Sequence, residues 1–395
     1  MLKALRYKKI LWPINLILFN ISRLSLFRRK NLWVFGAVRG TKYDDNAKYL
    51  FEYIKTFHSD EFRCLWLAQD KNVVALLREQ GYESYKSDSK EGYKIKLKAG
   101  VAFYTNGLDD FGYFPMLGGA KIVCLWHGFS FKRLYNYNYK GVKAVLKYIA
   151  DSLFNWVYRD YSMVTSEYVK SQFLAEFSIK NPDTIFITGQ PRNDALFRKV
   201  DMNNILTTSV IEKCQNKKII LYMPTYRAKG QGKRLDAIIK ELVEDEQLNL
   251  FLERTNYVFL IKLHPLTPPI NVRENDNFIV LEYTDVKANH ELLSLGDILV
   301  TDYSAVIVDY ALLNRPIIFY IPDKDEYIKY SGTLEEDFDK VSSLCKANSP
   351  QELLPLIKSP QMDVVKSIND IFSDVSTEGT CYCENVYEIV RNEVL

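Results

Sequence analysis

The sequence has few of the residues that build metal sites or disulfide frameworks. Histidine occurs only four times in 395 residues, and the six cysteines are scattered along the chain. Zinc sites and disulfide scaffolds need such residues at regular short spacings, and Cys381-Tyr-Cys383 has no second ligand pair. We therefore expect the cysteines to be reduced core residues, as is usual in cytosolic proteins, and we expect no metal or cofactor to be required.

The chain also lacks a strong excess of charge of either sign. Its 52 Lys and Arg residues nearly balance 49 Asp and Glu residues, which leaves a net charge of +3 at pH 7. Proteins that bind nucleic acids usually carry a pronounced basic surplus, so we expect no nucleic-acid partner. Internal repeats and low-complexity tracts are absent as well.

The chain does have the length and apolar content for two buried cores. A length of 395 residues favours two domains over one, and 47% hydrophobic with 26% charged residues is ordinary for a globular protein. Aromatic residues reach 14%, with 27 Tyr and 22 Phe. This content fits contact with sugars or a membrane surface, and equally fits a tyrosine-rich surface.

The first 30 residues combine basic and apolar side chains. Four bases within residues 3–9 precede the apolar run 10–19, and four more lie within residues 23–30. The run is shorter than the roughly 20 residues that span a bilayer, and no small-residue cleavage site follows it. We predict that residues 1–30 form a basic amphipathic helix on an anionic membrane surface. A helix packed on the protein's own core is the alternative.

Apolar runs alternate with helical stretches in both halves of the chain, which predicts an α/β protein with parallel, doubly wound sheets. Such sheets bind ligands at the carboxyl ends of their strands. We predict two Rossmann-like domains, 31–200 and 215–380, which face a central cleft, and a C-terminal helix at 381–395 that can pack back on the first domain. The predicted strands include 31–36, 63–68, 101–104, 121–126, 218–223, 258–263, 298–300 and 317–321. Mainly helical sequence is expected over 142–177, helices are expected at 235–252 and 305–313, and 198–217 is expected to be a charged and polar connection.

Polar turns follow several strands of the first half. His127, in Trp126-His127-Gly128, is expected to be exposed and close to the main chain, where it could take a proton from an attacking hydroxyl. A helix-capping role is the alternative. The turn 189–194 contains Arg192, which could hold a phosphate. The turn at 36–40 lacks the glycine spacing of a dinucleotide site.

Three further turns follow strands of the second half. Arg227 could clamp a diphosphate, and Pro265 keeps the preceding His264 extended at a strand tip. The turn 301–304 leads into a helix, whose first N–H groups and positive dipole end suit a phosphate. An ordinary turn that only caps the helix is the alternative. Together the turns predict a basic cleft that holds anions, as phosphoryl transfer requires.

At this point the sequence resembles a known family. It is similar to the CDP-glycerol glycerophosphotransferases, which comprise teichoic acid primases and polymerases and their capsule relatives. The resemblance covers about residues 31–330 and rests on an ordered set of motifs: NLWVFGAVRG (31–40), DDNAKYL (44–50), WHG (126–128), K (132), GQPRND (189–194), MPTYR (223–227), KLHP (262–265) and TDYSAVIVDYALLNRPIIFY (301–320).

The resemblance implies a fold, a location and a reaction. Family members have the GT-B fold, with the donor nucleotide mainly on the second domain, and they are peripheral proteins at the cytoplasmic face of the cell membrane. They transfer glycerol phosphate or ribitol phosphate from CDP-glycerol or CDP-ribitol to a hydroxyl of a lipid-linked or polymeric glycan, and they release CMP. Mg²⁺ could accompany the diphosphate, although no carboxylate cluster indicates it.

The resemblance also implies roles for individual residues. His127 is the expected base for the acceptor hydroxyl, whereas His264 and Arg227 are expected to hold the donor diphosphate as CMP leaves. Ala305 stands where the family usually has a second serine, so one hydroxyl contact is in doubt. The remaining donor-binding residues are Thr225, Thr301, Asp302 and Ser304, and the supporting residues are Gly128, Lys132, Arg192, Asn193 and Asp194.

Three other functions stay open at this point. The first is a GT-B glycosyltransferase with a nucleotide-sugar donor in surface polysaccharide synthesis. The second is an epimerase that acts on a UDP-sugar, and the third is an inactive scaffold docked at the membrane. The chain length slightly favours an enzyme that adds one or a few units over a large polymerase. The choice between glycerol and ribitol, the acceptor and the oligomeric state are not fixed by these motifs.

Overall fold

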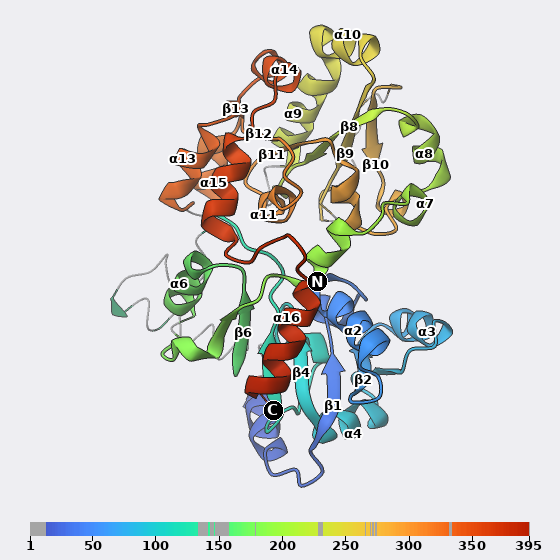
Figure 1. Ribbon diagram of the computed structural model, residues 1–395, viewed down its shortest axis with the longest axis vertical. Helices are drawn as coiled ribbons and strands as arrows, with labels where there is room; N and C mark the ends of the chain where they lie inside the picture. Colours follow the sequence, from blue (N-terminus) through green and yellow to red (C-terminus); the bar gives the residue numbers. More distant parts are fainter. Residues whose placement is uncertain are drawn as a thin grey trace. The chain divides into compact units, whose positions relative to one another are not determined.

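The described part of the chain forms two compact units (Figure 1). The computed structural model describes residues 13–132, 141, 142, 146, 158–177, 179–227, 232–264, 266–268, 270, 272, 275–331 and 334–394. The first unit takes its residues from Met1–His127, Leu134–Asp194 and Asp374–Leu395, and the second from Gly128–Arg133 and Ala195–Ser373. Each unit is built around its own parallel sheet.

The described residues of the first unit form a seven-stranded sheet in the order β3-β2-β1-β4-β5-β6-β7, with parallel pairing throughout. The chain winds outwards from β1 in both directions, so the connections reverse between β1 and β4. Doubly wound sheets bind ligands at this switch point. The strands are β1 (Arg29–Phe35), β2 (Arg63–Ala68), β3 (Ser84–Lys86), β4 (Ala99–Tyr104), β5 (Lys121–Cys124), β6 (Tyr161–Val164) and β7 (Ile185–Ile187).

Helices and buried apolar strands make the core of the first unit. The inner strand β1 buries Trp33, Val34 and Phe35 completely, as expected for a strand covered on both faces. The Asp44 carboxylate accepts the Asp45 N–H at the start of α2. The longer helices are α2 (Asp45–Phe57), α3 (Lys71–Glu79), α4 (Lys90–Lys98), α6 (Glu167–Glu176) and α16 (Tyr382–Ile389), and Pro191–Phe197 forms a 3₁₀ segment.

The C-terminal helix α16 belongs to the first unit, although it follows the second unit in the sequence. It packs against α2, where the rings of His58 and Tyr387 stack with centroids 3.7 Å apart. Asp194 accepts the N–H groups of Tyr382 and Cys383 at 2.7 and 2.9 Å and so caps the helix. The 189–194 turn is therefore tied to the end of the chain.

The described residues of the second unit form a six-stranded parallel sheet in the order β10-β9-β8-β11-β12-β13, with its switch point between β8 and β11. The strands are β8 (Lys218–Met223), β9 (Tyr257–Lys262), β10 (Phe278–Leu281), β11 (Ile298–Thr301), β12 (Ile317–Tyr320) and β13 (Lys346–Ala347). The helices are α7 (Met202–Ile205), α8 (Thr208–Cys214), α9 (Gly232–Glu244), α10 (Glu246–Arg254), α11 (Val306–Ala311), α12 (Lys324–Ser331), α13 (Glu336–Ser342), α14 (Pro350–Lys358) and α15 (Asp363–Phe372).

The two parallel α/β sheets confirm the predicted fold class, but three local predictions were wrong. The stretch 142–177 was expected to be mainly helical, and its described residues contain α6 but also the strand β6, because four residues carry too little periodicity to identify a strand. The helix expected at 235–252 is divided, because Asp245 accepts the Leu248 N–H at 2.8 Å and starts α10. The expected connection at 198–217 contains α7 and α8.

The predicted N-terminal helix is described only in part. Residues 13–22 are helical, whereas 1–12 lie outside the described residues. Arg28 anchors this segment, because its guanidinium donates to the main-chain oxygens of Ser22 and Ala99 at 3.3 and 2.9 Å. Among the helices that the structure describes, none has both the length and the apolar content to span a membrane.

Candidate functional site

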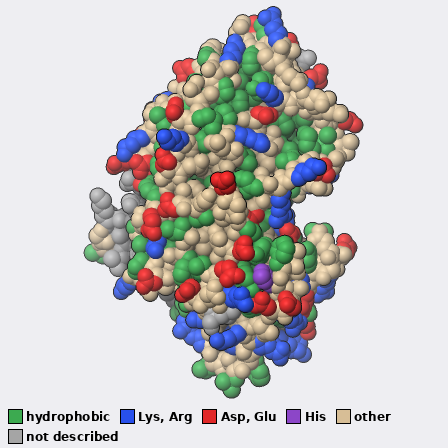
Figure 2. Space-filling view, viewed as in Figure 1, with side chains coloured by type: hydrophobic (Ala, Val, Ile, Leu, Met, Phe, Trp, Pro, Cys, Tyr) green, Lys and Arg blue, Asp and Glu red, His purple; other side chains and the backbone are tan. Residues whose placement is uncertain are grey.

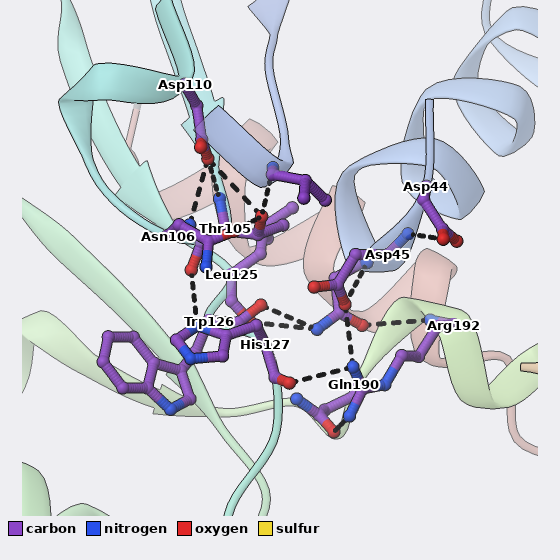
Figure 3. A network of polar contacts seen from close by, with 12 residues as sticks. Asp44, Asp45, Thr105, Asn106, Asp110, Leu125, Trp126, His127, Gln190 and Arg192 are labelled. Atoms are coloured by element: carbon purple, nitrogen blue, oxygen red, sulfur yellow. Dashed lines mark hydrogen bonds and ion pairs between the residues drawn. The ribbon is translucent and has the colours of Figure 1, made fainter. Parts of the chain in front are cut away.

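His127 lies just beyond β5, with its side chain exposed to solvent. Its ring Nδ1 is 3.1 Å from the main-chain oxygen of Thr105, which follows β4 (Figure 3). A carbonyl oxygen can only accept, so Nδ1 carries the proton and the Nε2 lone pair is available as a base. Although the residue is exposed at the surface, neighbouring protein atoms crowd the ring and displace part of its water, which lowers the pKa of His127; Asp45 raises this pKa, whereas Arg192 and Arg39 lower it.

The main chain around His127 has an unusual conformation. Trp126 has φ of 57° and Gly128 has φ of 124°, and the first value is rare for a bulky side chain. Gly128 thus supplies a conformation that other residues adopt only with strain. This geometry agrees with the prediction that His127 lies close to the main chain at the turn.

Asn46, in α2, and Arg192, in the 3₁₀ segment Pro191–Phe197, hold this turn. Arg192 Nη1 donates to the His127 oxygen at 3.1 Å and pairs with Asp45 at 2.8 Å (Figure 3). Asn46 Nδ2 donates to the oxygens of Leu125 and Trp126 at 3.2 and 3.0 Å. Direct contact between Arg192 and a phosphate stays a prediction; in this structure its guanidinium supports the turn that carries His127.

The loop that carries Thr105 is held by a buried carboxylate. Asp110 accepts the N–H groups of Arg39, Thr105 and Asn106 at 2.5, 2.8 and 3.0 Å (Figure 3). These residues follow β1 and β4, the two strands at the switch point of the first unit. The arrangement fixes the oxygen that selects the tautomer of His127.

The other predicted residues of the 189–194 turn have structural contacts. Asp194 caps α16, as described above, and also accepts the Cys381 thiol at 3.3 Å. Asn193 is buried, and its N–H donates to the Gln190 oxygen at 2.9 Å. The contacts of Asp194 could not be inferred from the sequence, because its partners lie almost 190 positions further along the chain.

In the second unit, the predicted residues gather at the switch point between β8 and β11. Asp302 accepts the N–H and the hydroxyl of Thr225 at 2.8 and 2.5 Å, and these bonds join the ends of the two strands. The Thr301 hydroxyl donates to the Met223 oxygen at 2.7 Å and joins them again. The side chains of Thr225, Thr301 and Asp302 therefore form a hydrogen-bonded frame at the carboxyl ends of β8 and β11.

Arg227 is enclosed by this frame. Its side chain is 1% exposed and pairs with Asp302 and Asp323, each at 2.8 Å. Burial alone would lower the pKa of Arg227, but the two aspartates more than compensate and raise it. The guanidinium also donates to the Thr225 oxygen at 2.7 Å. Direct contact between Arg227 and a diphosphate stays a prediction, and it requires one of these bonds to be exchanged.

Lys132 is the half-buried cation beside this frame. Its ammonium lies 5.1 Å from the centre of the Tyr327 ring, and within the described residues no carboxylate lies within 4.0 Å of it. Burial lowers the pKa of Lys132, Asp302 raises it, and Arg227 lowers it. Among the residues that the structure describes, Arg227 has carboxylate partners within ion-pair distance, whereas Lys132 has none.

Two further predicted residues lie at strand ends of the second unit. The exposed His264 accepts the Leu266 N–H at its Nδ1, 3.1 Å away, so in the neutral ring Nε2 carries the proton. The half-buried Ser304 accepts the Val306 N–H at 3.4 Å. The helix that follows, α11, begins after Ala305 and is shorter than predicted. His127 and His264 thus differ at Nδ1, which carries the proton in His127 and accepts a hydrogen bond in His264.

Sequence reasoning missed several residues of these networks. Asn46 and Asp110 bond to the main chain around His127 and Thr105, and Asp323 holds Arg227. The residues that were predicted correctly as part of strand-end turns were recognised because they directly follow a strand. Among the three missed residues, only Asp323 has this signal, since it lies two residues beyond the predicted strand 317–321. Within the described ranges, no group of three or more His, Cys, Asp or Glu side chains is arranged to hold a metal ion.

The chain is similar to several known proteins. A family model described as CDP-Glycerol:Poly(glycerophosphate) glycerophosphotransferase matches residues 17–370. The teichoic acid ribitol-phosphate primase of Bacillus spizizenii is 31% identical over 320 residues, 77% of this chain and 75% of the primase. The teichoic acid glycerol-phosphate transferase of Staphylococcus aureus is 30% identical over 319 residues, 77% of each chain.

A solved structure has a similar fold. A variant of the wall teichoic acid polymerase TagF, soaked with CDPG, matches 99% of both chains with a TM-score of 0.70 and 21% sequence identity. At this identity the likeness establishes a shared fold.

Proposed function

Because the chain belongs to the CDP-glycerol:poly(glycerophosphate) glycerophosphotransferase family, and is thus a CDP-alditol-dependent phosphotransferase, we propose that it transfers glycerol phosphate or ribitol phosphate to a glycan hydroxyl. The acceptor is a lipid-linked or polymeric glycan of teichoic-acid-like or capsule polymer synthesis, and the second product is CMP. The observation that carries the proposal is the geometry of His127, an exposed imidazole whose tautomer is set by the Thr105 oxygen.

In the proposed reaction, His127 acts as the general base. Its Nε2 removes the proton of the acceptor hydroxyl as that oxygen attacks the β-phosphorus of the CDP-alditol. A new phosphorus–oxygen bond forms to the acceptor, and the anhydride bond to the α-phosphate breaks. CMP leaves with the electron pair of that bond. A base with a lowered pKa is present in its neutral form at neutral pH.

We assign donor binding to residues of the second unit in two groups. Lys132, Ser304 and His264 supply a cation, a hydroxyl and a ring N–H for the diphosphate. The second group, Thr225, Arg227, Thr301 and Asp302, acts through the frame at the ends of β8 and β11. In this assignment Arg227 shapes the site, and Lys132 is the cation that meets the phosphates.

We further propose that the first described segment lies on an anionic membrane surface, at the cytoplasmic face. Seven large apolar side chains within residues 13–27 are exposed, and the most exposed of them is Leu26, at 94%. Figure 2 shows hydrophobic side chains flanked by Lys and Arg at the lower end of the view, where Figure 1 draws this segment. The seven are Ile14, Leu16, Ile17, Ile21, Leu24, Leu26 and Phe27. Exposed apolar groups beside bases suit a lipid interface.

A donor screen tests the proposed function. The purified full-length protein is incubated with CDP-glycerol, CDP-ribitol or UDP-sugars and a lipid-linked glycan, and the products are separated and weighed by mass spectrometry. We expect CMP and an acceptor that is heavier by one or more alditol phosphate units. Release of a nucleoside diphosphate from a UDP-sugar would instead identify a glycosyltransferase and would refute the proposal.

A further inference from the structure

The segment that leads into His127 is strained, and something must hold it. Trp126 has φ of 57°, a conformation that is strained for residues other than glycine and persists only when the surroundings fix it. The indole ring is buried and lies beside the imidazole, with ring centroids 4.4 Å apart. The strained residue is therefore the immediate neighbour of the proposed base.

Asn46 is the side chain that fixes this segment. Its Nδ2 donates to the Leu125 oxygen at 3.2 Å and to the Trp126 oxygen at 3.0 Å, and its Oδ1 accepts the Arg192 N–H at 3.1 Å. The side chain is completely buried. An amide is suited to this position because it offers two donors and an acceptor in one plane.

These bonds determine the direction of the imidazole. The Trp126 oxygen belongs to the peptide plane before His127, and the His127 oxygen, which accepts from Arg192 at 3.1 Å, belongs to the plane after it. Peptide planes are rigid, so fixing both sets the two main-chain dihedral angles of His127 and thereby the direction of its Cα–Cβ bond. The Thr105 oxygen then fixes the ring itself.

We propose that Asn46 is a positioning residue for the transfer reaction, because it fixes the peptide plane from which the His127 imidazole projects. The proposal rests on the proposed function, in which His127 is the base. Asn46 touches neither substrate nor reacting atoms in this account. Its effect reaches the reaction through the orientation of His127.

A purely local role for the Asn46 side chain does not account for its contacts. Asp44 and Asp45 already accept the first N–H groups of α2, including that of Asn46 itself. The three side-chain bonds of Asn46 all go to the two turns around His127 and Arg192. The side chain thus connects the start of α2 to the turn of the base.

The test compares Asn46 with an asparagine that has the same bonding pattern elsewhere. Asn249 Nδ2 donates to the main-chain oxygens of Val243 and Asp245 at 2.8 and 2.9 Å, and its Oδ1 accepts from Asn275 at 2.9 Å. Asn46→Ala and Asn46→Asp are therefore matched by Asn249→Ala and Asn249→Asp. The aspartate keeps the shape but places an acceptor against two carbonyl oxygens, so it is the more informative change.

Two measurements are made on each full-length protein. The first is kcat and KM for CMP release from CDP-glycerol in the presence of acceptor. The second is the nitrogen NMR spectrum of the histidine rings, which is simple because the chain has four histidines; a His127→Gln protein identifies the signals of His127. The spectrum reports the tautomer of His127 whether or not the enzyme turns over.

The proposal predicts a specific combination of results. Both Asn46 variants lose turnover by about tenfold to a hundredfold, as expected for a misplaced catalytic group, and KM changes much less. The His127 ring signals move away from the Nδ1–H tautomer, most strongly in Asn46→Asp. The Asn249 variants keep the wild-type kcat and ring signals.

Other outcomes overturn the proposal. A folded Asn46→Asp protein with wild-type kcat and unchanged His127 signals refutes it, and so do equal losses in the Asn46 and Asn249 variants, which indicate a general loss of stability. If the wild-type protein releases no CMP from any CDP-alditol, the proposed function fails. The His127 ring signals still decide in that case whether Asn46 positions the ring.

Discussion

The Nδ1 atom of His127 lies 3.1 Å from the main-chain oxygen of Thr105, and this contact decides which ring nitrogen can act as a base. The surrounding protein lowers the pKa of the ring below its ordinary value of 6.5. In the proposed mechanism the neutral ring is the active form, so kcat/KM should rise with pH through a value below 6.5 and then level off. A pH–rate profile checks this, and half-maximal activity above pH 6.5 would contradict it.

Arg192 contributes to that lowered pKa. Its positive charge opposes protonation of His127, whereas the Asp45 carboxylate, with which it pairs at 2.8 Å, favours protonation. Arg192→Gln removes the first effect, while burial and Arg39 still lower the pKa of His127 and Asp45 still raises it. We expect the acidic limb of the profile to move to higher pH, together with a lower plateau, because the His127 oxygen also loses a donor. An acidic limb that stays in place would show that Arg192 has no electrostatic role at the base.

Arg227 should matter first for stability. Removing one partner of a buried ion pair costs about 3–5 kcal/mol, because the other charge is left uncompensated, so Arg227→Met should markedly lower the urea midpoint of unfolding. The control is Arg234→Ala, which breaks the ion pair between Arg234 and Glu326, 3.9 Å apart. Their side chains are 47% and 57% exposed, respectively, and such exposed pairs contribute about 0–1 kcal/mol. Unchanged stability with a raised donor KM would instead identify Arg227 as a direct ligand of the diphosphate.

Lys132 should matter for donor binding. A hydrogen bond to a charged group contributes about 1.5–3 kcal/mol, so Lys132→Gln should raise the KM for CDP-glycerol at least about tenfold, with a smaller effect on kcat. Lys132→Arg should recover part of the loss, because it restores the charge. Lys340→Gln, at an exposed lysine of the same unit, is the control. Steady-state kinetics at fixed ionic strength measure the effect, and equal KM values for Lys132→Gln and the wild type would contradict the assignment.

Gly189 should be required for the docking of α16. It has φ of 75°, and a Cβ at this position would overlap the ring of Tyr382. Gly189→Ala should therefore speed hydrogen exchange at the amides of Tyr382–Ile389. Gly81→Ala is the matched control, because Gly81 has φ of 80° and no atom within 4 Å of the added carbon; it should show only the backbone strain of about 1–2 kcal/mol. Equal exchange of α16 in both variants would refute the role of Gly189.

The sequence was sufficient to predict a parallel sheet in each half, apart from the short strands β3, β6 and β13, and most of the turns that carry polar residues. Long buried strands such as β1 and β8 are recognisable because their apolar runs are bounded by polar residues, and ligand-binding residues follow strands in doubly wound sheets. His127 and Asp302 were found in this way. The family resemblance, which the family model confirms, added the reaction.

The sequence could not show which partners these residues take. Arg227 was expected to meet a diphosphate, but its charge is matched by Asp302 and by Asp323, which follows another strand. Asn46 looked like an ordinary residue of a helix start, because its bonds go to a turn about 80 positions away. Contacts between distant segments follow from the packed fold, and local patterns carry no signal for them.

The most direct test of the account is CMP release from CDP-glycerol by a His127→Gln protein. The account predicts turnover lower than that of the wild type by about 10²–10⁴-fold, the usual contribution of a general base, with the donor KM little changed. A His58→Gln protein, altered where the ring stacks on Tyr387, should keep its turnover. Near-wild-type turnover by a folded His127→Gln protein would contradict the account.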